Sequence, residues 1–268
     1  MSSSILVKRQ FQIELKDGYV IHGDVEFVED GTAKPVILLS HGFRGHKDWG
    51  FWPYAAAQLA ERGFYVVRYN FTRIDVRNSG ASEEEVQRNS TLTKELDDLA
   101  AVLGYLQRKQ LPAPSEYNHR KAAILGHSRA GASSIIFAAE SPEISAVIAW
   151  NGGPKPNPQV NGEPGPVAKD VLLNQKRFDT TLLLSQLQKP VLIVQGSNDA
   201  PRLIEGYRTL KAVTPEHTFI TLTGSDHTFG IGHPFTGTTP YLEEALEVSI
   251  AFLNKHIGNE SQDGTISG

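Results

Sequence analysis

The stretch Ala122-Ala-Ile-Leu-Gly-His-Ser-Arg-Ala-Gly131 constrains the fold more than any other part of this sequence. An apolar, strand-like run ends at Gly126, and Ser128 follows where the chain must turn sharply into a run of small residues. Small residues are needed there because bulky side chains would clash where a strand and the following helix pack closely. The pattern predicts a nucleophile elbow, a turn that holds a serine hydroxyl exposed above a sheet.

One position departs from the usual G-x-S-x-G pattern of such elbows. Ala130 occupies the place of the second glycine, and a glycine follows one position later at Gly131. Because alanine adds only a methyl group, we interpret this as a tolerated variant. Glycine-flanked serines also occur in ordinary loops, so the interpretation depends on finding partners for Ser128 elsewhere in the chain.

Composition narrows the class of protein. With 268 residues, of which 40% are hydrophobic, the chain can bury a sizeable core in one domain. It has no cysteine, which excludes disulfides, thiolate nucleophiles and thiolate metal sites. The net charge of −4 comes without long like-charge runs, so we expect no nucleic-acid partner.

The sequence also lacks the signals of a membrane or exported protein. No run approaches the ~18 apolar residues that a membrane helix needs. The start, Met-Ser-Ser-Ser-Ile-Leu-Val-Lys-Arg, has no long apolar segment of the kind found in signal peptides. We therefore expect a cytoplasmic protein with no membrane partner.

Strand signals run along most of the chain. Residues 5–15 alternate in polarity, Lys16-Asp17-Gly18 predicts a turn, and residues 19–27 follow as a second strand, which together predict an antiparallel hairpin. Short apolar runs then occur at 36–40, 64–69, 122–125, 144–150, 191–194 and 218–222. Runs of this kind, rich in Val and Ile, are typical of parallel strands buried on both faces.

Helical patterns separate these runs and give an α/β fold. A stripe of leucines at 92, 96, 99, 103 and 106 draws one apolar face, residues 51–62 predict a helix, and residues 239–257 predict a final amphipathic helix. Ser82 before three glutamates predicts a capping box. We expect one domain over residues 1–257 and a flexible tail over 258–268.

One segment interrupts the alternation of strands and helices. Residues 152–165 are too rich in Gly and Pro to form a regular element, and the following stretch to Leu187 is only weakly helical. Residues 152–187 form either a short lid over the serine or a plain surface excursion, and the sequence favours neither.

A serine hydroxyl needs a histidine as base, and that histidine needs an acid. In folds with this elbow the chain order is serine, acid, histidine, and the partners lie on loops after strands. His227 lies in such a loop, Gly224-Ser-Asp-His-Thr-Phe-Gly230, directly after the run 218–222. We expect His227 to be the base, and His233, in the same loop, is the alternative.

Asp199 is the favoured acid because it ends the turn after the run 191–194. Its alternative role is to cap the helix that begins near Pro201. Asp226 directly precedes His227, and sequence neighbours rarely orient toward each other's ring productively. The other position where the acid could lie is directly after the strand that ends at Trp150. That position is occupied by Asn151, which has no carboxylate.

The negative charge of a tetrahedral intermediate needs hydrogen-bond donors. The backbone N–H of Arg129, at the start of the helix after the serine, is one candidate. The stretch Val36–Gly45 supplies the other, because an apolar strand breaks there into His41-Gly42-Phe43. We expect the N–H of Phe43 to be this second donor.

Two groups of residues suggest how a substrate is held. Aromatic residues cluster after the oxyanion segment, and we expect Trp49 to line the pocket. The alternative to a pocket lining is that Trp52 and Tyr54 lie in a helix and pack in the core. Arg44 and Arg73 lie in loops near the predicted site, which favours a carboxylate or phosphate on the substrate. Solvated surface positions are the alternative for both arginines.

Together, the motifs resemble those of the α/β-hydrolase superfamily, in particular its small-lid carboxylesterases and dienelactone-hydrolase-like members. The stretches that carry the resemblance are His41-Gly-Phe-Arg-Gly45, Gly126-His-Ser128, Gln195-Gly-Ser-Asn-Asp199 and Gly224-Ser-Asp-His-Thr-Phe229. The resemblance extends from about Phe11 to Ile257. It implies a mostly parallel, eight-stranded sheet with helices on both faces and an N-terminal antiparallel hairpin.

The same resemblance implies roles for individual residues. Ser128 would be the nucleophile, His227 the general base and then acid, and Asp199 the carboxylate that orients the histidine, with the N–H groups of Phe43 and Arg129 as oxyanion hole. Dienelactone hydrolases proper use a cysteine, which this chain lacks. We expect a serine hydrolase that cleaves a small-molecule carboxylic ester through an acyl-enzyme, needs no cofactor or metal, and is a monomer or homodimer. An acyltransferase with the same triad and a non-catalytic ligand-binding protein are the alternatives.

Overall fold

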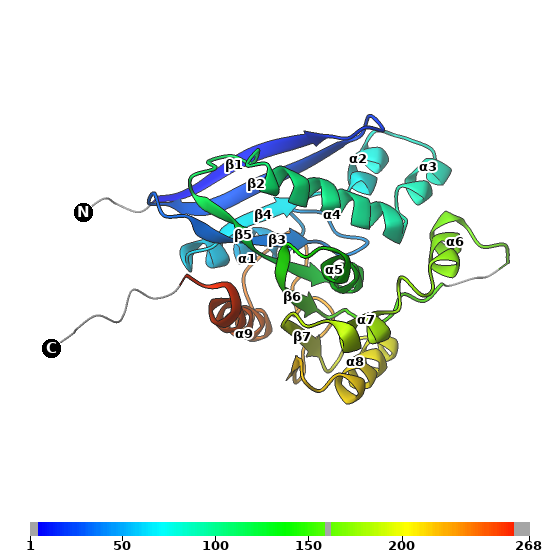
Figure 1. The fold of residues 1–268 in the computed structure, drawn as a ribbon. Coiled ribbons are helices and arrows are strands. Elements are labelled where there is room, and N and C mark those ends of the chain that lie inside the picture. The colour runs from blue at the N-terminus through cyan, green and yellow to red at the C-terminus, as the bar shows by residue number, and fades with distance from the viewer. Residues whose placement is uncertain (1–4, 159–161, 260–268) are drawn as a thin grey trace.

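A single sheet organises the computed structural model, which describes residues 5–158 and 162–259. The sheet is eight-stranded, in the order β1-β2-β4-β3-β5-β6-β7-β8 (Figure 1). Its strands are β1 (Ile5–Glu14), β2 (Val20–Glu29), β3 (Lys34–Ser40), β4 (Tyr65–Tyr69), β5 (Tyr117–His127), β6 (Ile144–Trp150), β7 (Val191–Gly196) and β8 (Thr218–Leu222). β2 is antiparallel to both β1 and β4, and the remaining neighbours are parallel. The predicted mostly parallel sheet with an N-terminal hairpin is confirmed.

Helices cover both faces of this sheet (Figure 1). They are α1 (Trp52–Glu61), α2 (Thr72–Asn78), α3 (Glu83–Arg88), α4 (Leu92–Gln107), α5 (Arg129–Glu140), α6 (Pro166–Leu173), α7 (Thr180–Gln186), α8 (Pro201–Val213) and α9 (Pro240–Ile257). The core on one face includes Leu59 of α1 and Leu246 of α9. The core on the other face includes Leu99 of α4, Ile135 of α5 and Tyr207 of α8. The parallel strands are therefore buried on both sides, as their apolar runs predict.

One strand is longer than its apolar run. β5 begins at Tyr117 rather than at Ala122, and it includes the polar stretch Asn118–Lys121. The first residues of β5 pair with the start of β3, and the register shifts between Pro35 and Val36 before the apolar part begins. Backbone pairing at the end of a strand needs no apolar side chain, so hydrophobicity alone did not mark this extension.

The Gly- and Pro-rich segment is partly ordered into two helices. α6 and α7 fall within the expected region 152–187, and α6 packs beside α3 and α4. Residues 152–158 and 162–165 form no regular element. Most of the predicted tail, residues 260–268, lies outside the described residues, as does part of the segment at 159–161.

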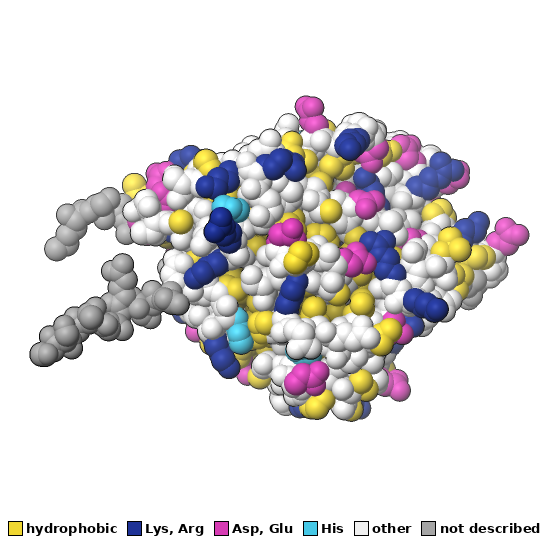
Figure 2. Space-filling view, viewed as in Figure 1, with side chains coloured by type: hydrophobic (Ala, Val, Ile, Leu, Met, Phe, Trp, Pro, Cys, Tyr) yellow, Lys and Arg dark blue, Asp and Glu magenta, His cyan; other side chains and the backbone are white. Residues whose placement is uncertain are grey.

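The surface carries charges of both signs. On the face that Figure 2 presents, Lys and Arg side chains are interspersed with Asp and Glu. Within residues 5–158 and 162–259, every helix is too short or too polar to cross a membrane.

Candidate active site

Ser128 occupies a strained turn between β5 and α5. Its backbone lies at φ 59° and ψ −123°, a conformation that a non-glycine residue adopts at a cost of about 1–3 kcal/mol. Close packing holds the turn in place, because a Cβ atom on Gly126 would lie 2.1 Å from the carbonyl oxygen of Ala130. Ala130 itself is fully buried. The alanine variant of the elbow pattern is therefore accommodated, and Gly126, two residues before the serine, is the elbow position where an added Cβ would clash most closely.

The structure brings Ser128, His227 and Asp199 together from three different strand ends. His227 Nε2 lies 3.0 Å from Ser128 Oγ, and His227 Nδ1 lies 2.9 Å from Asp199 Oδ2. Since a carboxylate can only accept, Nδ1 carries the ring proton and Nε2 is left to accept from the serine hydroxyl. The arrangement can therefore deprotonate Ser128 and stabilise the imidazolium that forms.

The surroundings of Asp199 stabilise its ionised form. Burial opposes its ionisation, but hydrogen bonds from His227, from the N–H of Ala200 and from Gln195 Nε2 outweigh that effect and hold the pKa of the carboxyl below its usual value. An ionised Asp199 fixes the ring proton of His227 on Nδ1, the tautomer that leaves Nε2 free to accept.

The alternative partners have other contacts. His233 Nδ1 accepts a hydrogen bond from the N–H of Gly50, and its ring stacks on Trp49. Asp226 Oδ1 accepts from the N–H groups of Thr228 and Gly230, which stabilises the turn around His227. Neither side chain is hydrogen-bonded to Ser128 in the described residues.

Two residues for which the sequence predicted no role hold the loop of His227. His127 Nε2 lies 2.8 Å from the carbonyl oxygen of His227, and Asn151 Nδ2 lies 2.9 Å from the same oxygen. Burial, with the nearby His227 ring adding to it, lowers the pKa of His127 to about 3, so His127 is neutral and donates from Nε2. Both residues lie at the ends of buried strands, where a polar side chain needs a hydrogen-bond partner. That position in the sequence is the feature from which their structural role could have been predicted.

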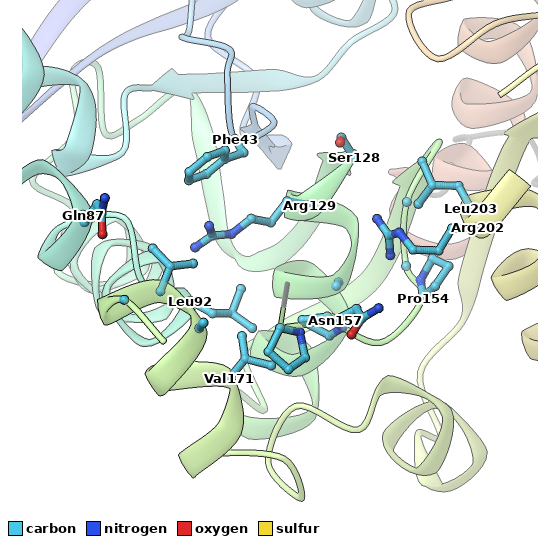
Figure 3. Close-up of a pocket in the computed structure, with 18 of the residues that line it drawn as sticks. Phe43, Gln87, Leu92, Ser128, Arg129, Pro154, Asn157, Val171, Arg202 and Leu203 are labelled. Atoms are coloured by element: carbon cyan, nitrogen blue, oxygen red, sulfur yellow. The ribbon is translucent and has the colours of Figure 1, made fainter. Parts of the chain in front are cut away.

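The expected oxyanion donors flank the serine. Phe43 and Arg129 line the same cavity as Ser128 (Figure 3). Within the described part of the chain, the backbone N–H groups of Phe43 and Arg129 have no hydrogen-bond acceptor. Two unpaired N–H donors on residues that share a cavity with a serine hydroxyl can bind an oxygen that becomes negatively charged there.

The cavity beside Ser128 measures about 630 Å³ and extends toward α3, α6 and α8. Its wall includes the apolar side chains of Leu92, Val171 and Leu203, and Gln87 and Arg202 lie on opposite sides in Figure 3. A cavity of this size fits a small organic molecule. No cluster of three or more potential metal ligands occurs in the described ranges.

Solved structures with the same fold cover more than nine-tenths of this chain. Est1E from Butyrivibrio proteoclasticus with bound ferulic acid is 21% identical, with 93% of this chain and 100% of that chain covered and a TM-score of 0.70. The esterase domain of a Rhodothermus marinus protein is 20% identical, with 94% and 100% covered and a TM-score of 0.67. A putative dienelactone hydrolase from Klebsiella pneumoniae is 15% identical, with 94% and 100% covered and a TM-score of 0.65.

This chain has the α/β-hydrolase fold. Protein-family models and curated protein sequences give no match to it. The strand order, the elbow after β5 and the loops after β7 and β8 therefore carry the assignment of the fold.

Three residues expected to contact substrate are not among the residues that line this cavity. Arg73 was expected near the mouth of the site, but its side chain is fully buried and is ion-paired with Glu95. Arg44 is exposed and Trp49 packs edge-on against Phe51, and neither is among the residues that line the cavity. The burial of Arg73 could have been predicted from its partner. Glu95 lies within the apolar stripe of α4, and a buried carboxylate needs a buried cation.

Proposed function

We propose that this protein is a serine hydrolase that cleaves carboxylic esters through an acyl-enzyme. The observation that carries the proposal is the continuous hydrogen-bonded path from Asp199 through His227 to Ser128, at the wall of a cavity large enough for a small ester. The names of two similar structures, an esterase domain and a putative dienelactone hydrolase, support ester cleavage as the class of reaction.

Acylation begins when Ser128 Oγ attacks the ester carbonyl carbon and His227 Nε2 takes the hydroxyl proton. Asp199 stabilises the resulting imidazolium through Nδ1. The carbonyl oxygen becomes negatively charged and accepts hydrogen bonds from the N–H groups of Phe43 and Arg129. When the carbon–oxygen bond of the ester breaks, the departing alcohol takes the proton from His227.

Deacylation repeats these steps with water. His227 Nε2 removes a proton from a water molecule as the water oxygen attacks the acyl carbon. The same two N–H groups stabilise the second tetrahedral intermediate. Its collapse returns the proton to Ser128 Oγ and releases the carboxylic acid.

The cavity suggests a substrate with an apolar body and an anionic group. Leu92, Val171 and Leu203 supply apolar contact. Arg202, in the first turn of α8, also lines the cavity and has no ion-pair or hydrogen-bond partner among residues 5–158 and 162–259. The expected preference for a carboxylate or phosphate on the substrate is therefore better assigned to Arg202 than to Arg73.

The test is hydrolysis of short alkyl, long alkyl and aromatic p-nitrophenyl esters by the parent and by Ser128→Ala. We expect the variant to lose about 10⁴- to 10⁶-fold in kcat/KM, as expected when a triad nucleophile is removed. Ser185→Ala, an exposed serine on α7, is the matched control and should leave kcat/KM unchanged. Equal turnover by the parent and Ser128→Ala would remove the proposal. Ester formation on addition of an alcohol would favour the acyltransferase alternative.

A further inference from the structure

A buried cluster of charges lies behind the oxyanion segment. Arg73 of α2 is fully buried, and its Nη1 donates to Glu95 Oε1 at 2.5 Å. Glu95 of α4 is only 1% exposed. Its Oε1 also lies 3.2 Å from Arg129 Nε, and its Oε2 accepts from Ser133 Oγ at 2.5 Å. One carboxylate therefore joins α2 to the helix that begins directly after Ser128.

Arg73 also binds the peptide that supplies an oxyanion donor. The carbonyl oxygen of Gly42 lies 3.1 Å from Arg73 Nη2, 2.8 Å from His41 Nδ1 and 3.1 Å from the N–H of Gly45. In a planar trans peptide the C=O and N–H groups point in opposite directions. Holding the Gly42 oxygen toward Arg73 therefore turns the N–H of Phe43 the other way.

The position of Phe43 is fixed on two further sides. Arg73 Nε donates to the carbonyl oxygen of Phe43 at 3.3 Å. The phenyl ring lies 5.5 Å from the guanidinium carbon of Arg73 and 4.8 Å from that of Arg129. Figure 3 shows the ring beside the Arg129 side chain, at the wall of the cavity. Cations over an aromatic face attract it, so both arginines hold the ring.

We propose that Arg73 is a positioning residue that orients the Gly42–Phe43 peptide as an oxyanion donor, with Glu95 linking it to the Arg129 donor. This inference rests on the proposed function of the site. Arg73 is buried outside the cavity lining and acts through the peptide that it binds. A cation bound to the Gly42 carbonyl also polarises the peptide, which makes the N–H of Phe43 a stronger donor.

The charge needed for this role is present at neutral pH. Burial lowers the pKa of Arg73 to about 10, although the carboxylate of Glu95 acts in the opposite direction. Arg73 therefore remains protonated at neutral pH. Removing Glu95 alone would leave a buried arginine charge without its partner, which destabilises the fold. The informative variant therefore changes the geometry of the cation at position 73 and keeps its charge.

Arg73→Lys is that variant. A lysine keeps the positive charge but lacks the planar fork that reaches Glu95, Gly42 and Phe43 together. Arg68→Lys is the matched control, because Arg68 is an equally buried arginine whose partners are Glu26, Asp48 and the Lys47 carbonyl. Thermal unfolding of both variants checks that each is folded.

We expect Arg73→Lys to lower kcat about 10- to 100-fold with KM changed less than about two-fold, because an oxyanion donor acts mainly in the transition state. Binding of phenylboronic acid, which forms a tetrahedral adduct with a serine, should weaken by a similar factor. Arg68→Lys should change neither quantity by more than about two-fold. Equal losses in the two variants, or a loss confined to KM, would overturn the assignment of Arg73.

A second readout does not depend on turnover. The amide resonance of Phe43 can be followed in protein labelled with ¹⁵N-phenylalanine and assigned with Phe43→Leu. It should shift in Arg73→Lys and stay in place in Arg68→Lys. An unmoved resonance would overturn the positioning role whatever the ester assays give. A parent without esterase activity would overturn the proposed function, and the resonance would then decide the role of Arg73 by itself.

Discussion

Asn151 joins the loop that carries His227 to the end of the strand that leads to Asp199. Its Nδ2 donates to the carbonyl oxygen of His227 at 2.9 Å, and its Oδ1 accepts from the N–H of Gly196 at 2.7 Å. Asn151 lies at φ 47°, a left-handed conformation that asparagine tolerates better than most residues. Asn151, directly after β6, therefore aligns the two loops that carry Asp199 and His227.

The choice of Asp199 over Asp226 can be tested with a matched pair. Asp199→Asn should lower kcat/KM about 10⁴-fold, because an amide in place of the carboxylate favours the wrong tautomer of His227. Asp226→Asn changes an exposed carboxylate beside the same histidine and should keep kcat/KM within about ten-fold of the parent. A larger loss in Asp226→Asn than in Asp199→Asn would reverse the assignment of the acid.

Local patterns predicted much of this molecule. Val- and Ile-rich runs gave the parallel strands, and the small residues around Ser128 gave the elbow, because each depends on packing within a few residues. The burial of Arg73 was not predicted, because it depends on residues distant in the sequence. Its burial depends on Glu95 and on the Gly42 carbonyl, which lie far from it in sequence. A carboxylate inside an apolar helical stripe predicts a buried cation, but it does not say which one.

The cavity could not be predicted from the sequence either. Its wall is built from α3, α4, α5, α6, α8 and the segments after β3 and β6. Only the folded arrangement brings Leu92, Val171 and Leu203 to the same space. Aromatic residues near the oxyanion segment predicted Trp49 in the pocket lining, whereas Trp49 packs on Phe51 and His233 and does not line this cavity.

Gly152 should be as necessary as the glycine of the elbow. A Cβ atom at this position would lie 2.1 Å from the carbonyl oxygen of Ser128 and 3.1 Å from its nitrogen. Gly152→Ala should therefore displace Ser128 and lower kcat/KM by about 100-fold or more, as small misplacements of reacting groups do. Gly232→Ala is the control, because a Cβ there meets nothing within 4 Å. Similar kinetics for the two variants would refute the close-contact argument.

Arg202 and Arg44 can be compared for their effect on charged esters. Arg202→Gln should raise KM for an ester bearing a free carboxylate by about ten-fold, roughly the worth of one charge-assisted hydrogen bond, and leave a neutral ester of equal size unaffected. Arg44→Gln should change neither KM, because Arg44 does not line the cavity. An equal effect of Arg202→Gln on both esters would show that charge recognition is not its role.

Asp98 should make stability depend on pH. Burial raises the pKa of its carboxyl to about 6 from a usual 3.8, although Thr72 donates two hydrogen bonds to it. Between those values the folded chain binds more protons than the unfolded chain. The contribution of Asp98 to the free energy of unfolding is therefore full below pH 4 and is lost as the pH rises through 6.

Asp98→Asn isolates this effect because asparagine does not titrate. Urea unfolding from pH 4 to pH 8 should show the stability of the parent falling relative to Asp98→Asn by about 2 kcal/mol as the pH rises, and remaining level above pH 7. A difference that is constant, or that grows with pH, would contradict the raised pKa.

The place of β8 in the sheet links activity to partial unfolding. β8 pairs only with β7 and forms one edge of the sheet, and His227 follows it by a few residues. An edge strand can separate while the central strands stay paired, since local opening costs less than global unfolding. Such an opening would move His227 away from Ser128 and leave most of the helical signal intact. Ester turnover should then be lost at a lower urea concentration than the far-UV circular dichroism signal, so the loss of turnover would report the separation of β8 from the sheet.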